Sequence, residues 1–555
     1  MNVNDAITIG EKQQKEFEKS LPAGFWGEIK KEVKAMAVTK IGIPMGHNTL
    51  YDTELIFSRV IGMQASGREV DFRDVLSYEL SPIPTSLFDD SGETRICKAK
   101  SDLKNSTKVE VSARNLEMDC TVFDGSTLLW TVPWPASSVT NPALVNDYIT
   151  SFKQVIERKL KTRDVCLVFD RYVEYSIKCC ARRSRRPGGC KIFQLSKSSP
   201  LPPKNQVLAI SENKKQLIGI LIEGLMADET LVKNTVHKLV ITGQEEAPKE
   251  VSQGGHVIDR NDLKTTHEEA DPIVVAQAMY IAREERKSVS VVADDTDIYV
   301  LLLHHYFYLD SHVPMIMESP KKEKSCIDIP ATVAKNKDII PDLLAAHALT
   351  GCDVVCMHYG IGKGKMLTTL RLGNSNLSLL GDLNANREEV MAQATVFICS
   401  CYNKKNCRSM TEARIGAWAH KIGRKTKTPK LCTLPPTTPA FQLNVMRAHY
   451  QCAIWKEALE DPPDVDPCDY GWMKDEETKI LKPSYLPSSR QPAPDYVLKL
   501  VCCSCASENP CRSKACGCNA ARLACTVFCQ CQASVNCRND ETKNVEDECS
   551  DEEQL

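Results

Sequence analysis

The sequence predicts an α/β protein, with a parallel-sheet core and flanking helices joined to a small cysteine-rich zinc module. Three short apolar runs, CTVF (120–123), VCLVF (165–169) and VSVVA (289–293), have the continuous hydrophobicity of strands buried on both faces. Helical patterns such as the one over residues 142–161 alternate with these runs, which is typical of an α/β fold. Ten of the 26 cysteines lie within residues 502–537, and this density indicates a separate module.

The composition excludes several classes of protein. The 555 residues carry 70 basic and 72 acidic side chains, so the chain is neither a uniformly basic nucleic-acid coat nor an acidic disordered protein. No run approaches the roughly 18 apolar residues of a membrane span, and the polar N-terminal sequence is not that of a secretory signal. We therefore expect a protein that is neither in a membrane nor secreted. In a reducing compartment, dense cysteine indicates metal rather than disulfides.

Changes in composition along the chain define six segments. Pro and Ser are frequent in the linker, the helical region before it contains a predicted amphipathic helix over residues 441–460, and the end of the chain is acidic without apolar periodicity. The predicted segments are an N-terminal mixed α/β region (1–115), the parallel-sheet core (116–385), a mainly helical region (386–474), the linker (475–498), the cysteine module (499–540) and an acidic disordered tail (541–555).

Each predicted strand leads into acidic residues. The first strand leads into Asp124, the second into Asp170, and the third into a group that includes Asp295. Ligands of open parallel sheets bind outside the carboxyl ends of the strands, so these side chains should meet in one crevice. Two further segments contribute acids, at the start of a predicted helix and before a glycine-rich turn. The full set predicted to converge is Asp124, Asp170, Glu269, Asp271, Asp295, Asp297 and Asp353.

Clustered carboxylates favour divalent cations. They repel one another and raise each other's pKa values unless positive charge lies between them. Mg²⁺ binds carboxylate oxygens, water and substrate phosphate, and two such ions about 4 Å apart promote phosphodiester cleavage. Taken singly, each acid is also compatible with a turn or a helix cap, and Glu269, three residues after Thr266, fits a capping box.

Five acidic motifs follow one another along the chain: VFDGS, VFDRY, EEAD, ADDTD, and TGCD followed by GIGKGK. Their order resembles the flap-endonuclease branch of the PIN-like nuclease superfamily over about residues 116–385. The resemblance implies a nuclease whose seven acids hold two Mg²⁺ or Mn²⁺ ions. Asp271 stands where the family usually has Glu, and Arg171 where it favours Gly. The resemblance also implies groups that contact nucleic-acid phosphates: Lys178, Arg182 and Arg183 after the second strand, and Gly360, Gly362 and Lys363 in the glycine-rich turn.

The cysteine block contains a threefold repeat. Its three C-x-C pairs recur every 13 residues, and each pair is followed by one more cysteine. Zinc prefers four thiolates, so nine cysteines can hold three ions if three of them bridge two ions each. A disulfide framework and a redox or metal-storage tail are the alternatives, and Cys502 is an extra cysteine without a ligand role. The predicted zinc ligands are Cys503, Cys505, Cys511, Cys516, Cys518, Cys525, Cys529, Cys531 and Cys537.

This pattern resembles the tesmin/TSO1-like CXC domain over about residues 500–540, which implies a cluster of about three zinc ions that binds DNA. Ala515 stands where the family has a Tyr that contacts DNA, and the spacing between Cys531 and Cys537 is longer than usual. We therefore expect phosphate contacts rather than base reading. The basic residues expected to make these contacts are Lys499, Arg512, Lys514 and Arg522.

Together these features predict a Mg²⁺-dependent nucleic-acid phosphodiesterase, of structure-specific nuclease type, with a zinc-cluster DNA-binding module. DNA is the expected partner, and an arginine-rich loop after residue 181 predicts a nuclear location. Two alternatives stay open: a catalytically inactive PIN-like protein that binds DNA or chromatin, and a protein-interaction protein. The whole chain also resembles uncharacterised multicopy animal proteins, which favours a mobile-element origin. A lesser group, Cys399, Cys401 and Cys407 with His420, fits either one zinc ion or core thiols.

Overall fold

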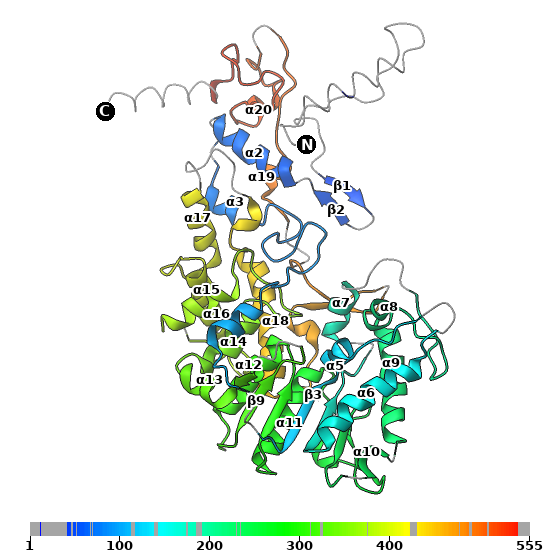
Figure 1. Cartoon of the computed structure of the whole chain (residues 1–555). Coiled ribbons are helices and arrows are strands. Elements are labelled where there is room, and N and C mark those ends of the chain that lie inside the picture. Colours follow the sequence, from blue (N-terminus) through cyan, green and yellow to red (C-terminus); the bar gives the residue numbers. More distant parts are fainter. Residues whose placement is uncertain are drawn as a thin grey trace, which may run out of the picture. The chain divides into compact units, whose positions relative to one another are not determined.

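The computed structural model describes Lys12 and most of residues 42–541 (Figure 1). The chain divides into two compact units, one formed by Asp71–Ala493 and the other by Met1–Val70 with Pro494–Leu555. The predicted acidic tail lies outside the described residues from 542 onward. Within 42–541 the description omits residues 46–47, 52, 67, 69, 113–116, 138–141, 174–175, 185–190, 229, 234, 311, 322–325, 374–375, 422–429, 477, 488–490 and 508–509.

The larger unit is built on an eight-stranded sheet with the order β10-β9-β8-β3-β4-β5-β6-β7. The predicted α/β fold with a parallel sheet is confirmed, since the three apolar runs form the buried neighbours β3, β4 and β8. Its central strands are parallel: β9 (Met315–Glu318), β8 (Val289–Val292), β3 (Cys120–Asp124), β4 (Asp164–Val168) and β5 (Leu239–Thr242). Antiparallel strands flank them: β10 (Cys326–Asp328), β6 (Lys249–Val251) and β7 (Val257–Asp259).

Helices cover both faces of the sheet (Figure 1). Along β3, Val122 packs in one hydrophobic cluster and Phe123 in the other, because successive strand side chains point to opposite faces. The Phe123 face is covered by α5 (Gly125–Thr131), α6 (Val145–Leu160), α8 (Lys204–Leu208), α9 (Ser211–Met226) and α10 (Thr230–Lys233). The Val122 face is covered by α11 (Ala270–Arg283), α12 (Thr296–Phe307), α13 (Ile329–Lys335), α14 (Ile340–Leu349), α15 (Lys363–Arg371), α16 (Arg387–Cys401), α17 (Met410–Lys421) and α18 (Thr438–Lys456).

The helix predicted over residues 441–460 is α18, which begins and ends a few residues earlier. We expected it to be amphipathic, but nearly all of its residues from Ala440 to Trp455 are buried. The cause is its position, because α18 packs against α14 and against the helices around it rather than lying on the surface.

The order of the strands creates a switch point between β3 and β8. From β3 the chain continues to β4 and β5 on one side, and later returns to the other side of β3 for β8 and β9. Connections that leave the carboxyl ends of β3 and β8 therefore diverge, and a crevice remains between them. This is the place where the predicted acids were expected to meet.

Short elements complete the larger unit. The short elements are α3 (Phe72–Leu76), α4 (Ser101–Thr107), α7 (Ile177–Ser184), the 3-10 helices η3 (Asn261–Leu263), η4 (Leu431–Thr433) and η5 (Pro467–Tyr470), and the antiparallel strands β11 (Trp472–Lys474) and β12 (Leu481–Pro483).

Among the helices that the structure describes, none combines the length and apolarity needed to cross a membrane.

The smaller unit joins a segment from each half of the chain. Its interior at the cysteine module consists of cysteine side chains rather than large apolar residues. The regular elements of the unit are β1 (Gly42–Met45), β2 (Asn48–Tyr51), α2 (Thr53–Ala65), α19 (Asp495–Leu498) and α20 (Gly517–Ala520).

Candidate active site and cysteine cluster

Asp124 and Asp170 lie at the ends of the adjacent strands β3 and β4. Asp124 is the last residue of β3 and caps α5, where its carboxylate accepts hydrogen bonds from the Ser126 amide (2.9 Å) and the Thr127 hydroxyl. Asp170 accepts hydrogen bonds from Ser126 Oγ (3.1 Å) and from the amide of Ala270 (3.0 Å), the first residue of α11. These bonds hold the two strand ends and the start of α11 together.

The start of α11 supplies three more carboxylates. Glu269 occupies the N-cap position of the helix without a side-chain capping hydrogen bond, and Asp271 lies in its first turn. Lys178 of α7 lies between them, with its Nζ 2.9 Å from Glu269 Oε2 and 3.2 Å from Asp271 Oδ2. Arg182, one turn further along α7, has its Nη1 2.5 Å from Glu268 Oε1. Helix α7 therefore presents two of its predicted basic residues to the acids at the start of α11.

The third strand end brings together residues that are far apart in the sequence. Asp295 caps α12 after β8, and its carboxylate accepts a hydrogen bond from the Asp297 amide (2.8 Å). Asp297 is only 2% exposed, and Lys100 Nζ lies 3.0 Å from its Oδ2 and 2.5 Å from Asp353 Oδ1. His347 Nε2 lies 2.8 Å from Asp297 Oδ1. Because burial lowers the pKa of His347 to about 4, its neutral ring donates this hydrogen bond.

Two of these basic residues were missed in the sequence. Lys100 precedes α4, and Lys214 of α9 has its Nζ 2.9 Å from Ser126 Oγ and 4.0 Å from Asp170 Oδ2. Both lie in ordinary charged stretches, KAKSDLK and ENKKQ, so no local pattern separates them from surface lysines. The side chain of Arg183, predicted to contact phosphate, lies outside the described residues.

Arg171, at a position where the resemblance favours Gly, has a structural role. Its buried guanidinium donates to the backbone carbonyls of Thr265 (2.5 Å), His267 (3.0 Å) and Glu246 (3.0 Å). Its own amide donates to the carbonyl of Glu268 (2.9 Å). These bonds fix the chain that leads into α11, so Arg171 supports the position of the acids.

Carboxyl groups outnumber basic groups in this region. Burial raises the pKa of Asp271 well above its usual range and also raises that of Glu269, although Lys178 opposes both shifts. Burial and the charge of Asp297 raise the pKa of Asp295 to about 7. The acids are Asp124, Asp170, Glu268, Glu269, Asp271, Asp295, Asp297 and Asp353, and the basic groups among them are Lys100, Lys178, Arg182 and Lys214. Such an excess of carboxylate oxygens suits Mg²⁺ or Mn²⁺.

The lysines hold the carboxylates in pairs. Lys100 lies between Asp297 and Asp353, and Lys178 lies between Glu269 and Asp271. Among the residues that the structure describes, groups of three or more potential metal donors within 4.8 Å of one another consist of cysteines alone. The carboxylates are therefore suitable ligands for divalent ions. In this structure, the ammonium groups of Lys100 and Lys178 supply the positive charge between them.

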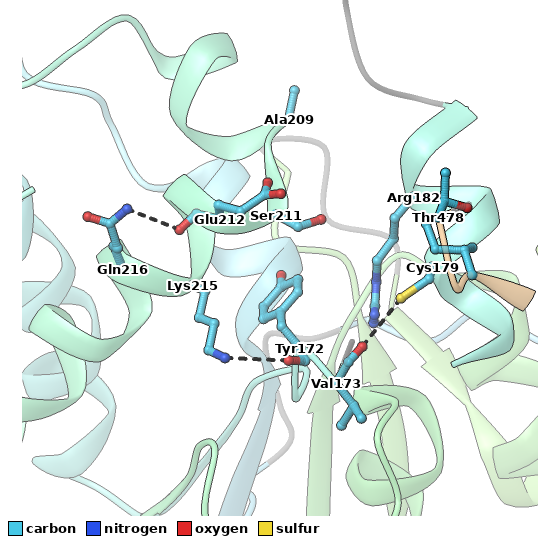
Figure 2. A pocket seen from close by; sticks show the side chains of 11 residues that line it. Tyr172, Val173, Cys179, Arg182, Ala209, Ser211, Glu212, Lys215, Gln216 and Thr478 are labelled. Carbon is cyan, nitrogen blue, oxygen red and sulfur yellow. Dashed lines mark hydrogen bonds between the residues drawn. The ribbon is translucent and has the colours of Figure 1, made fainter. Parts of the chain in front are cut away.

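Five of these acids border a cleft of about 430 Å³: Asp124, Asp170, Asp271, Asp295 and Asp353. A second cavity of about 510 Å³ adjoins this cleft and shares Tyr172, Arg182, Ala209 and Ser211 with it. Figure 2 shows this cavity, with Tyr172 near its centre and Lys215 and Arg182 on either side of the ring. The guanidinium carbon of Arg182 lies 5.0 Å from the centroid of the Tyr172 ring. The acidic cleft therefore continues past an aromatic ring and an arginine into a second chamber.

In the glycine-rich turn before α15, the space beside Gly360 and Gly362 is free of other described atoms, whereas the Lys363 side chain is buried. A Cβ on Gly360 or Gly362 would meet no atom of the described residues within 4 Å, and Gly360 has a φ of +76°. Lys363 is only 1% exposed, and its Nζ donates to the carbonyls of His347 (2.8 Å) and Gly351 (2.7 Å). Burial lowers the pKa of Lys363 to about 8. The predicted phosphate contact of Lys363 is therefore corrected: its ammonium group is enclosed and holds the turn to α14.

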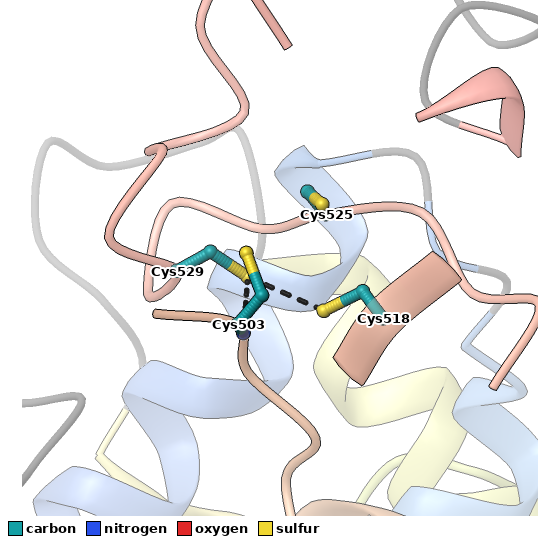
Figure 3. Close-up of side chains that lie close together, drawn as sticks. All are labelled: Cys503, Cys518, Cys525 and Cys529. Atoms are coloured by element: carbon teal, nitrogen blue, oxygen red, sulfur yellow. Dashed lines mark hydrogen bonds between the residues drawn. The ribbon is translucent and has the colours of Figure 1, made fainter. Parts of the chain in front are cut away.

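Three groups of four cysteines form the interior of the cysteine module. In each group, all four sulfur atoms lie within 4.8 Å of one another. Figure 3 shows the first group, in which Cys518 Sγ and Cys529 Sγ lie 3.5 Å apart. The groups are Cys503, Cys518, Cys525 and Cys529; Cys503, Cys511, Cys525 and Cys531; and Cys503, Cys505, Cys511 and Cys516. Each is a donor set that zinc can use.

The groups share cysteines. Three zinc ions with four thiolate ligands each would require such sharing if only nine cysteines are present. Cys503 belongs to all three groups, and Cys511 and Cys525 belong to two each. Cys537 is buried in the same cluster but outside the three groups, and Cys502 also stands outside them. The module thus brings eight of the nine predicted ligands into groups suitable for zinc. The residues predicted to contact phosphate are all exposed: Lys499, Arg512, Lys514 and Arg522.

The lesser cysteine group is part of the hydrophobic core. Cys399 and Cys401 are buried, and Cys401 Sγ donates to the hydroxyl oxygen of Thr369 (3.4 Å). Neither cysteine, nor Cys407, belongs to a candidate metal group among the described residues. The core-thiol interpretation therefore suits this group better than a zinc site.

Comparison with known proteins adds little to this picture. No protein-family model matches the chain, and no curated protein matches it. One solved structure that matches is described as "The catalytic core of Rad2 in complex with DNA substrate (complex III)". It is 10% identical, with 64% of this chain and 95% of that chain covered and a TM-score of 0.30.

Proposed function

We propose that this protein is a metal-dependent nucleic-acid phosphodiesterase, of structure-specific nuclease type, with a zinc-cluster module that binds nucleic acid. One observation carries the proposal. Acids from the ends of β3, β4 and β8, from the start of α11 and from the segment after α14 gather in one cleft, where they outnumber the basic groups. A structural ion-pair network would need no such excess of buried carboxyl groups over basic groups.

The acids would hold two Mg²⁺ or Mn²⁺ ions, as the resemblance to flap endonucleases implies. Such ions supply charge neutralisation and an activated water for attack on a phosphodiester. Asp271, Asp295 and Asp353 border the cleft directly, and the helix caps of Asp124 and Asp295 fix the directions of their carboxylates. Asp170 is held by Ser126 and by the start of α11, which orients it toward the same cleft.

The basic residues of the cleft would bind the phosphate of the substrate. Lys178, Arg182 and Lys214 border the cleft together with the acids. A cation placed beside a scissile phosphate stabilises the negative charge that develops on its oxygens. The adjoining cavity beyond Tyr172 offers space for the next nucleotide of the strand. The open glycine turn at Gly360 and Gly362 would approach a more distant phosphate.

The cysteine module would hold about three zinc ions and bind DNA. Its exposed basic residues supply phosphate contacts, which carry affinity without sequence specificity. A nuclear location follows as part of the same proposal, because DNA is the substrate that both the cleft and the module would engage.

A cleavage assay tests the enzymatic proposal. Labelled single-stranded, duplex, flapped and hairpin DNA and RNA are incubated with the zinc-loaded full chain, with Mg²⁺, with Mn²⁺ or with EDTA. The Asp295→Asn/Asp297→Asn double variant serves as the test, and Asp338→Asn, which changes an exposed acid outside the cleft, serves as the control. We expect metal-dependent cleavage by the wild type and the control, and a loss of at least about 100-fold in the double variant. Equal cleavage by the double variant would refute this assignment.

A second candidate function is a nucleic-acid-binding protein without turnover. The observation that favours it is that Lys100 and Lys178 already bridge carboxylate pairs in the cleft. If these ion pairs persist with Mg²⁺ present, no substrate will be cleaved, although DNA affinity will still fall steeply with salt. Charge reversal at Lys514 or Arg522 would then weaken binding, whereas a protein-interaction role predicts no effect of these changes on DNA.

A further inference from the structure

The segment that precedes the larger unit contacts the cysteine module closely. Helix α2 has a buried face formed by Leu55, Ile56, Val60 and Met63. It packs against α19, the short helix that leads into the module. Both segments belong to the smaller unit of the chain, although more than 400 residues separate them in the sequence.

One arginine of this segment joins three parts of the module. The Arg68 side chain is 7% exposed, and its Nε donates to the carbonyl of Ala524 (2.7 Å). Its Nη2 donates to the carbonyl of Val501 (2.8 Å) and to the sulfur of Cys518 (3.3 Å). Val501 lies two residues before Cys503 and Ala524 directly before Cys525, which both belong to the zinc groups, and Cys518 is itself a member of one group. A single guanidinium therefore fixes three chain segments that supply zinc ligands.

Further contacts support the same docking. Arg59 Nη1 donates to the carbonyls of Val497 (3.1 Å) and Leu498 (3.0 Å) at the end of α19. Gly62 lies against the ring of Phe528, and a Cβ there would overlap that ring. Phe528 immediately precedes Cys529, so α2 also supports the third cysteine pair.

The charge of a zinc cluster gives this arginine a chemical role. Three Zn²⁺ ions bound by nine thiolates carry less positive charge than the thiolates carry negative charge. A buried anionic cluster needs a cation or donors beside its sulfurs. Arg68 supplies both, because its planar fork can bind a sulfur and two carbonyls at once.

We propose that the segment from α2 to Arg68 is an integral part of the zinc site, and that Arg68 is a positioning residue which holds the ligand segments and neutralises the thiolate cluster. The proposal rests on the proposed zinc cluster. It assigns α2 and Arg68 to a metal site formed with the cysteine module. Outer partners of this kind change metal affinity by about 10–100-fold when they are removed.

Zinc retention by the full-length protein tests the proposal. Zinc per chain is measured by elemental analysis, and its release is followed with the chelator 4-(2-pyridylazo)resorcinol. Arg68→Met removes the charge and the fork, whereas Arg68→Lys keeps the charge alone. Gln64→Ala, on an exposed position of α2, is the matched control. We expect Arg68→Met to release zinc at least about tenfold faster than the wild type, Arg68→Lys to be intermediate, and Gln64→Ala to be unchanged.

The outcomes distinguish the role of Arg68 from the presence of the zinc cluster itself. Equal zinc content and release in the wild type and Arg68→Met would refute the role of Arg68 while leaving the zinc cluster intact. A wild type that binds no zinc would overturn both. If Arg68→Met is insoluble, Arg59→Met, which loses only the contacts to α19, should still show faster release; unchanged release would count against the docking of α2. Far-UV circular dichroism checks that the helices of the larger unit are retained.

Discussion

At the scale of single residues, the cleft is organised by basic side chains that each serve two acids. Lys100 binds Asp297 and Asp353, and Lys178 binds Glu269 and Asp271. Breaking a buried ion pair leaves an uncompensated charge, which is far more costly than the loss of an exposed pair. The acids therefore depend on positive charge from some source, either a lysine or a metal ion.

Lys100→Met should destabilise the protein when divalent ions are absent. Lys100 is 15% exposed, so its removal leaves Asp297 and Asp353 without their shared cation, at a cost of about 3 kcal/mol in the free energy of unfolding. Mg²⁺ bound at the same acids would restore part of this loss. Thermal unfolding in EDTA and in Mg²⁺ should show a larger Mg²⁺-induced rise in Tm for the variant than for the wild type.

Lys321→Met is the matched control for this experiment. Lys321 also pairs with an acid of the same region, Asp294 (3.1 Å), but is 73% exposed. Its removal should change Tm very little in either buffer. If Mg²⁺ stabilised Lys100→Met no more than the wild type, the acids beside Lys100 would not be a metal site.

His358 makes stability depend on pH. Burial lowers the pKa of His358 to about 3, and its two ring nitrogens have no hydrogen-bond partner among the described residues. Below about pH 6.5 the unfolded chain binds a proton at this position that the folded protein does not. The contribution of neutral His358 to stability is therefore present above pH 6.5 and is lost as the pH falls toward 3.

His358→Leu should remove this dependence. Denaturant unfolding between pH 7.5 and 5 should show the wild type losing about 1.4 kcal/mol per pH unit relative to the variant below pH 6. His256→Leu, at an exposed histidine, should follow the wild type. Parallel curves for the wild type and His358→Leu would show that His358 takes up its proton in the folded protein.

At the scale of secondary structure, the acids are placed by abrupt transitions from strand to helix. Asp124 ends β3 and is followed at once by α5, while Asp295 lies between β8 and α12. Carboxylates at helix N-termini are stabilised by free backbone amides. A transition without a loop needs close approach of the chain, and Gly125 provides it beside Phe169 and Val168.

Gly125→Ala should disturb this transition. An added Cβ would lie 2.5 Å from Phe169 Cδ1 and 2.7 Å from the carbonyl oxygen of Val168, so β3 and β4 must shift. We expect a loss of about 1–3 kcal/mol in the free energy of unfolding and slower cleavage. In α9, Gly219→Ala meets no described atom within 4 Å and should instead stabilise by about 0.5–1 kcal/mol. Equal effects of the two changes on stability would contradict the structure at Gly125.

At the scale of the whole molecule, the two units depend on different sources of stability. The larger unit has extensive apolar clusters on both faces of its sheet. The interior of the cysteine module consists of thiols, so its order should require bound metal. Metal removal should therefore act on one unit and spare the other.

A zinc-selective chelator should unfold the smaller unit locally. Hydrogen exchange followed by mass spectrometry should show faster exchange over residues 494–541 and, because α2 docks on the module, over residues 53–68. Exchange in β3, β4 and β8 should be unchanged, since their protection comes from apolar burial. Slow exchange in the module after complete zinc removal would show that metal is not required for its structure.

The parallel sheet and the positions of its three buried strands β3, β4 and β8 could be predicted from the sequence. Apolar runs such as residues 165–169 are continuous because strands buried on both faces have no polar side, and this signal is local. The acids after these strands could be predicted to share one edge, since parallel strands end at the same edge. The cysteine repeat is equally local, and eight of its nine predicted ligands lie in groups suitable for zinc.

Which residues complete these sites depends on contacts between distant parts of the chain. Lys100, His347 and Arg68 contact partners at least 50 residues away in the sequence. The sequence around a single charged or aromatic residue does not indicate such a distant partner. Lys363 is the opposite case. A lysine among glycines predicts a phosphate contact, but in the folded protein this side chain is buried. Periodicity and spacing report local geometry, whereas burial and charge pairing depend on which distant segments the fold brings together.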